Sequence, residues 1–150
     1  MSKRSIILLA LLILSPVVIY FLWPTDEGRI KKLFREGAAA VEQKKLDDVM
    51  SKISFNYSDG KGLSYITIKE SMKRIFSEMK DIKVECDVRA IEIRDDKATA
   101  GADLRVIATS GNDTGYFIGD AAKPVSMKFF LEKERMKWLI VSSEGGPALE

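Results

Sequence analysis

The sequence contains no histidine and only one cysteine, Cys86, in 150 residues. Histidine is the commonest general base and zinc ligand, so its absence excludes mechanisms and metal sites that depend on it. A single cysteine allows neither an internal disulfide nor a Cys-x-x-Cys motif, and a catalytic Cys–His pair is excluded as well. We expect no metal site, no cofactor and no histidine-dependent chemistry.

The sequence also lacks an excess of either charge outside its first segment. Lysine and arginine number 24 against 22 aspartate and glutamate, and two of the basic residues, Lys3 and Arg4, precede a long apolar run. Without these two, 22 residues of each sign remain, interspersed along the chain. A nucleic-acid-binding protein concentrates its basic residues in a patch or stripe. None is visible, so nucleic acid is not an expected partner.

The apolar run Ile6–Trp23 contains no charged residue. As a helix its 18 residues would span roughly 27 Å, close to the thickness of a bilayer core. Tyr20 and Trp23 lie where an interfacial aromatic belt is expected. A cleaved secretory signal is the alternative, but the end of the run offers no A-x-A-like cleavage site. We therefore expect residues 1–23 to form an uncleaved anchor in the lipid bilayer and residues 24–150 to form one folded domain.

The orientation of this anchor rests on two opposing signals. Lys3 and Arg4 favour a cytoplasmic N-terminus, whereas four basic residues soon after the run favour the reverse (Arg29, Lys31, Lys32 and Arg35). These four belong to an amphipathic segment that also carries acidic residues, and folded domains are often translocated regardless of such charges. We expect a single-pass protein of the bacterial inner membrane with its C-terminal domain in the periplasm.

The first part of the expected domain has the pattern of three helices. Apolar residues recur at helical spacing over residues 26–45, 46–53 and 68–80, and the tetrad 67–70 has the form of a capping box. Between the second and third helices, aromatic and polar residues alternate over residues 55–58, which predicts a brief strand.

The remaining sequence has the period of an antiparallel sheet. Its alternation predicts four strands, at about residues 82–93, 98–108, 125–131 and 138–142. A slip in the phase of the first strand indicates a β-bulge near Ala90 and Ile91. The segment Ser110–Pro124 is long for a hairpin connection, and we expect it to be a loop that acts as a lid or contact surface.

The order of these elements and two segments of the sequence resemble the nuclear-transport-factor-2-like superfamily, which includes the SnoaL-like proteins. The segments are KKLDDVMSKISFNYSD, similar to the family's second helix and first strand, and MKWLIVSSEG, similar to its last strand. The resemblance covers about residues 26–144. It implies an α+β cone, in which three helices pack on a strongly curved antiparallel sheet with an apolar cavity at the wide end. Members include isomerases, dehydratases, cyclases and non-catalytic binding domains, so the fold leaves the function open.

The inward face of the expected strands carries no acid–base pair, so we expect no catalytic residue. The strand carboxylates alternate onto the opposite face, where they are expected to form ion pairs across the sheet (Glu85, Asp87 and Asp103 with Lys83, Arg89, Arg105 and Lys128). Four residues remain as candidates to line a ligand pocket: Tyr57, Asp59, Tyr65 and Tyr116. A buried tyrosine and a turn-forming aspartate are the simpler interpretations of Tyr57 and Asp59.

Two functions fit these observations. One is a non-catalytic binding or assembly module of the cell envelope, with an envelope protein or a second copy as its partner. The other is a carrier of a small apolar ligand, or a SnoaL-like isomerase or cyclase, that uses the cone cavity. A cone filled by large side chains would exclude the second function (Phe34, Phe76, Met79, Phe129 and Trp138).

The anchor is testable without knowledge of the function. The protein should stay in membranes through high-salt and carbonate washes and should keep the mass of the intact chain, with or without Met1. A fragment that begins near Thr25 should be soluble and folded. Protease added to spheroplasts should digest the domain, whereas protection until lysis would show that the orientation is inverted.

Overall fold

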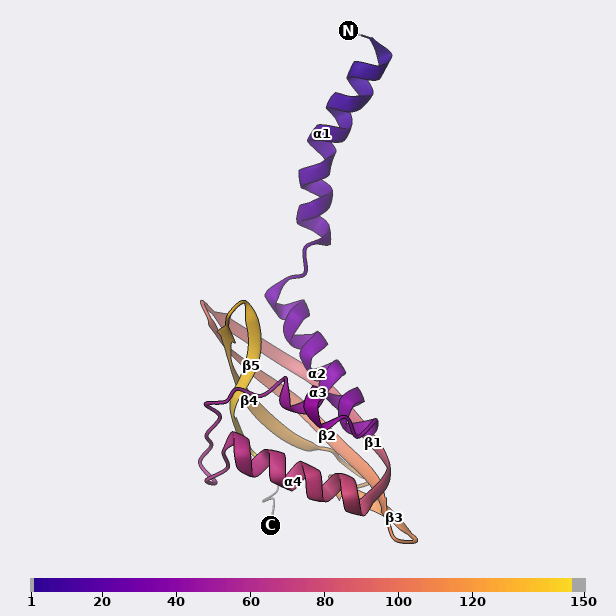
Figure 1. The fold of residues 1–150 in the computed structure, drawn as a ribbon, viewed down its shortest axis with the longest axis vertical. Helices are drawn as coiled ribbons and strands as arrows, with labels where there is room; N and C mark the ends of the chain where they lie inside the picture. Colours follow the sequence, from indigo (N-terminus) through magenta and orange to yellow (C-terminus); the bar gives the residue numbers. More distant parts are fainter. Residues whose placement is uncertain (1, 147–150) are drawn as a thin grey trace.

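The computed structural model describes residues 2–146 (Figure 1). Residue 1 and residues 147–150, the outer ends of the expected anchor and domain, lie outside this range. The elements in chain order are α1 (Lys3–Leu22), α2 (Asp26–Glu42), α3 (Leu46–Met50), α4 (Tyr65–Glu78), β1 (Met79–Arg94), β2 (Lys97–Ser110), β3 (Asp113–Ile118), β4 (Val125–Glu134) and β5 (Lys137–Glu144). Helices α2 to α4 lie against one curved antiparallel sheet, which confirms the predicted α+β class.

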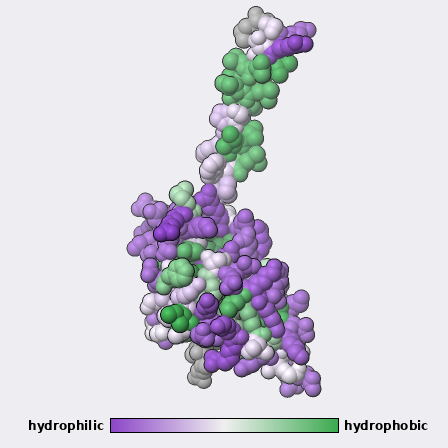
Figure 2. Space-filling model, viewed as in Figure 1, coloured by the Kyte–Doolittle hydropathy of each residue, from purple (hydrophilic) through white to green (hydrophobic). Residues whose placement is uncertain are grey.

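Helix α1 stands away from the rest of the protein (Figure 1). It begins after Ser2, whose side chain accepts a hydrogen bond from the backbone N–H of Ser5, and none of its residues is buried. Figure 2 shows apolar side chains along most of its length, whereas the visible face of the domain is largely hydrophilic. The helix is long and apolar enough to cross a membrane, a property that an N-terminal signal sequence shares.

The strand order is β1-β2-β4-β5, and β3 pairs with the end of β2 that β4 leaves free. The register of β1 against β2 shifts between Val88 and Ala90, one residue before the predicted position of the bulge. Because of this shift Ala90 is exposed, while Ile91 and Ile93 turn towards the core.

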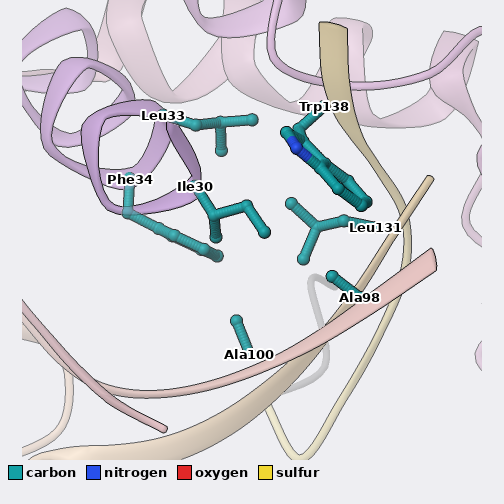
Figure 3. Packing of buried hydrophobic residues seen from close by; sticks show 7 residues of the cluster. All are labelled: Ile30, Leu33, Phe34, Ala98, Ala100, Leu131 and Trp138. Atoms are coloured by element: carbon teal, nitrogen blue, oxygen red, sulfur yellow. The ribbon is translucent and has the colours of Figure 1, made fainter. Parts of the chain in front are cut away.

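The core lies where α2 crosses the alanine-rich part of β2 (Figure 3). Its buried residues are Ile30, Leu33 and Phe34 from α2, Ala98 and Ala100 from β2, Leu131 from β4 and Trp138 from β5. Ala98 and Ala100 have short side chains, so the helix approaches the sheet closely and Ile30 and Leu131 become almost completely inaccessible to water. Burial of each such side chain stabilises the fold by roughly 1.5–3 kcal/mol. Ala98 and Ala100 are thus covered by the helix and belong to the packed core.

The predicted strand at residues 55–58 does not form. The chain instead makes two isolated bridges, one from Ile53 to Ile140 and one from Ser58 to Ser64. Between them the backbone turns, with the N–H of Tyr57 donating to the carbonyl of Ser54, and this turn interrupts a continuous strand.

Two other boundaries differ from prediction. Helix α4 begins at Tyr65 because Ser64, not Thr67, is its N-cap; Ser64 and Thr67 form the reciprocal hydrogen bonds of a capping box. The segment predicted as a loop, Ser110–Pro124, contains β3, which forms a hairpin with β2. The sequence pattern missed this strand because nearly all of β3 is exposed and has no apolar alternation.

The start of α2 is fastened to the β4–β5 hairpin by Asp26. The indole Nε1–H of Trp138 donates to Oδ1 of Asp26 at 3.0 Å, and the ammonium of Lys133 donates to Oδ2 at 3.0 Å. The Lys133 ammonium also lies 5.1 Å from the centre of the Trp138 ring. The hydrogen bond from Trp138, followed by that from Lys133, lowers the pKa of Asp26 below its ordinary value of 3.8.

Replacing Asp26 by asparagine tests the contribution of these two hydrogen bonds to stability. The ionised carboxylate is stabilised in the folded state, so its contribution should be complete above pH 3.8 and lost as pH falls through the lowered folded-state pKa. Because Asp26 is partly exposed, we expect D26N to lower the free energy of unfolding at pH 7 by only about 1 kcal/mol. Urea denaturation of D26N and wild type should give curves that converge at acidic pH.

The matched control is D113N, at an exposed carboxylate on β3. It should leave the unfolding free energy almost unchanged at both pH values. A D26N effect that persists undiminished at low pH would contradict the role assigned to the carboxylate charge.

Candidate functional site

A cavity of about 330 Å³ lies between helices α2 and α4 and the inner face of the sheet. It adjoins the core and extends towards the end of the sheet that lies farther from α1 (Figure 1). Its wall is almost wholly apolar, and it is partly open to solvent. The main apolar contributors are Leu33, Phe34, Gly37 and Val41 from α2, Ile68, Met72 and Ile75 from α4, and Val84, Leu104, Val106 and Ala108 from the sheet.

Helix α4 explains why this volume stays open. Its apolar residues recur on one face, as predicted, yet none of its residues is fully buried. Ile68, Met72 and Ile75 line the cavity and are only partly buried. The helix therefore forms one wall of the cavity and does not fill it.

One end of the cavity carries hydroxyl groups. Tyr57 is 6% exposed, and its hydroxyl donates to Oδ2 of Asp59 at 3.1 Å and shares a hydrogen bond of 2.8 Å with Oγ of Ser143. All three residues line the cavity. Burial, reinforced by the neighbouring Asp59 carboxylate, raises the pKa of Tyr57 above 10.0. Tyr57 is therefore a neutral hydroxyl at physiological pH.

The carboxylate of Asp59 is already well supplied with donors. Besides the Tyr57 hydroxyl, the backbone N–H groups of Lys61 and Leu63 donate to its Oδ1 at 2.9 and 3.0 Å. These bonds close the turn between α3 and α4 and orient Asp59 towards Tyr57. With these three donors, Asp59 is better suited to hold the Tyr57 hydroxyl in place than to act as a general base that accepts a proton from a substrate.

Ser143 has no counterpart among the residues proposed from the sequence. Strict alternation along β5 would place Trp138, Ile140 and Ser142 on the inner face. The register between β4 and β5 shifts so that Val141 is an extra residue, and Ser143 takes the inward position opposite Phe129. The sequence contains no turn residue or glycine that would signal this bulge.

The other two pocket candidates lie elsewhere. Tyr65 packs against Phe55, with ring centres 4.6 Å apart, and does not line the cavity. Tyr116 is exposed on β3, while the next residue, Phe117, contributes to the cavity wall. The structure thus brings Tyr57 and Asp59 together and leaves Tyr65 and Tyr116 outside.

Two lysines border the cavity, and both have partners. Lys52 forms an ion pair of 2.6 Å with Glu36, and the ammonium of Lys61 donates to the carbonyl of Gly146. Both positive charges are thus engaged with oxygens of the protein.

The outer face of the sheet has the predicted ion pairs in part. Arg89 contacts Asp103 at 2.7 Å and Arg105 contacts Glu85 at 2.9 Å. Lys83 and Lys128 form no ion pair within residues 2–146. In the same range no three Cys, Asp or Glu side chains lie close enough to hold a metal ion.

Comparison with known proteins relates the chain to others through its fold. No protein-family model matches the sequence, and no curated protein matches it. A protein provisionally assigned as an aromatic ring hydroxylase, from Novosphingobium aromaticivorans, has 15% identity and a TM-score of 0.65, with 77% of this chain and 83% of that chain covered. A protein provisionally assigned as a scytalone dehydratase, from the same species, has 8% identity and a TM-score of 0.63, with 80% of this chain and 87% of that chain covered.

A third solved structure is an NTF2-like protein of unknown function from Shewanella oneidensis. It has 14% identity and a TM-score of 0.58, with 79% of this chain and 97% of that chain covered. At these identities the likeness shows the fold alone. The domain therefore has the nuclear-transport-factor-2-like fold that the sequence resembles, and the function has to be argued from its own side chains.

The buried hydroxyl of Tyr57 should be visible in an alkaline titration. Because its pKa is raised, Tyr57 should still be protonated in the folded protein at pH 10.0, and the fold should lose stability as pH rises beyond that value through the raised pKa. The absorbance of tyrosinate measures this. The difference between the titrations of wild type and Y57F isolates this hydroxyl, and its midpoint should lie above pH 10.0. A midpoint at or below that pH would contradict the burial of the hydroxyl.

Proposed function

We propose that this chain is a membrane-anchored binding domain whose cavity holds a small apolar ligand with one hydrogen-bonding group. The observation that carries this proposal is the open apolar cavity with the hydroxyls of Tyr57 and Ser143 at one end. The wall supplies hydrophobic binding energy, and the hydroxyls supply orientation.

The size of the cavity supports a ligand of this kind. Binding sites for small molecules typically enclose about 300–1,000 Å³, and this cavity has about 330 Å³. An apolar cavity of about 150 Å³ is large enough for benzene. The ligand is therefore about twice as large as a single aromatic ring.

The arrangement of large side chains favours a carrier over a purely structural module. Phe34, Met79 and Phe129 line the cavity without closing it, and Trp138 lies in the core beside α2. The hydrogen bonds that saturate Asp59 favour binding over acid–base catalysis. Of the two functions considered from the sequence, the ligand carrier is the one that this geometry supports better.

The N-terminal helix supplies the location in this proposal. Helix α1 has no buried residue, and its apolar run follows Lys3 and Arg4 in its first turn, which favours a transmembrane anchor with the domain in the periplasm. A tether to the inner membrane keeps the cavity close to that membrane and raises its effective concentration for ligands and partners there.

Dye binding tests the cavity directly. The fragment from Thr25, once its fold has been verified by circular dichroism, should bind the neutral apolar dye N-phenyl-naphthylamine with an increase in fluorescence. Ala108 is buried and lines the cavity, so A108F should fill part of the volume and weaken dye binding at least about tenfold, which corresponds to about 1.4 kcal/mol.

The control is A90F, because Ala90 is exposed and lies outside the cavity wall. It should bind the dye as wild type does. Equal binding by wild type and A108F, with both proteins folded, would refute the proposal that the cavity takes apolar ligands.

A further inference from the structure

The connection between β4 and β5 has an unusual composition for its geometry. It consists of Arg135 and Met136, with φ values of 49° and 70°. Two-residue hairpin turns in which both residues have positive φ favour Asn-Gly or Asp-Gly, because other side chains are strained there. Met136 is also 75% exposed, although it is a large apolar residue. The turn therefore places a strained methionine at the apex of a hairpin.

This apex lies at the end of the domain from which α1 departs (Figure 1). Asp26, the first residue of α2, binds Trp138 and Lys133 near the base of the apex. The apex extends two residues beyond the Lys133–Trp138 pair, which is about 7 Å. The three-residue linker between α1 and α2 spans at most about 10 Å. Even with the linker fully extended along the hairpin, the apex therefore ends within about 3 Å of the plane in which α1 ends.

The charges beside Met136 complement an anionic surface. Arg135 and Lys137 flank it, are exposed and form no ion pair within residues 2–146. The carboxylate of Glu134 points away from the apex, because it accepts a hydrogen bond from the hydroxyl of Ser54. The neighbouring β1–β2 turn is tied to this hairpin through the N–H of Lys133 and the carbonyl of Asp96. That turn carries Asp95 and Asp96 between Arg94 and Lys97, so its charges balance.

We propose that the β4–β5 apex is a second membrane contact, in which Met136 enters the interfacial layer of the bilayer and Arg135 and Lys137 bind lipid phosphates. The inference rests on the membrane anchor of the proposed function and does not depend on the ligand. Apolar side chains flanked by basic residues bind anionic membrane surfaces through both burial and charge. A lipid contact also explains why a strained methionine stands where asparagine and glycine would relieve the strain.

The contact gives the domain a fixed orientation on the membrane. Helix α1, joined by a three-residue linker, restrains the position of the domain on the membrane but allows the domain to tilt. A second contact restrains the tilt of the domain as well. Because Asp26 joins the start of α2 to the hairpin, the apex and the point where the linker enters the domain belong to one rigid unit. The cavity, which extends towards the other end of the sheet, is then held facing away from the bilayer.

A fluorescent probe at the apex tests the contact in the full chain. In a C86A background, M136C carries an environment-sensitive dye, and the protein is reconstituted into vesicles of phosphatidylcholine and phosphatidylglycerol in equal parts. We expect a blue-shifted emission that nitroxide-labelled lipids quench. N112C is the matched control, because Asn112 is exposed in the β2–β3 turn near the other end of the sheet, and its dye should report water.

Two further variants separate the contribution of the basic residues from that of Met136. R135E/K137E, with the probe at position 136, should lose most of the quenching in these vesicles. R135N/M136G should melt at a higher temperature than wild type, because the backbone strain of the turn is relieved. With the dye attached at position 137, nitroxide-labelled lipids should quench its emission less in R135N/M136G than in the protein with the original turn. An increase in melting temperature without any change in quenching would overturn the role of Met136.

Flotation of the vesicles distinguishes failure of the membrane anchor from failure of the apex contact. If the chain does not float with the vesicles, the membrane anchor fails, and the apex contact fails with it. If the chain floats and the probe at position 136 is as exposed to water as the probe at position 112, only the apex contact is overturned. Ligand binding by the cavity is unaffected by either result.

Discussion

The close approach of α2 to the alanine-rich part of β2 determines the rest of the domain. Ala98 and Ala100 let the first half of the helix lie against the sheet, where Ile30 and Leu131 are sealed from water. Farther along β2 the inward residues are Leu104, Val106 and Ala108, and the second half of α2 faces the cavity. The alanines at the start of β2 therefore set a packed core at one end of the sheet, and the hollow lies at the other end, where the helix no longer packs on them.

The sequence predicted what depends on periodicity and missed what depends on single hydrogen bonds. Strand β1 with its bulge and the apolar face of α4 follow from alternation and helical spacing, because burial of one face imposes that pattern. Ser143 could not be placed, since the bulge at Val141 reverses the alternation without a sequence signal. Strand β3 was missed for the opposite reason, because it pairs through its backbone and buries little.

The candidate site shows the same division. Tyr57 and Asp59 were proposed from their types and their place after the second helix, and they do lie together at one end of the cavity. Their hydrogen-bonded geometry depends on a turn closed by the Lys61 and Leu63 amides, which no spacing rule specifies. Proteins with this fold are provisionally assigned different activities, so the hydroxyl pair carries the functional argument and the fold does not.

The weak packing of α4 has a consequence for the rates at which the cavity can fill and empty. A helix without one fully buried residue belongs to the least stable part of a native structure, where local opening costs little free energy. Its departure from the sheet would expose the cavity while the core around Trp138 stays intact. An occupant that binds the apolar face of α4 would then slow that opening, because it adds to the closed state the contacts that the helix lacks. Occupancy and helix order would rise together, so the residence time of an occupant would be set by the fraying of one amphipathic helix.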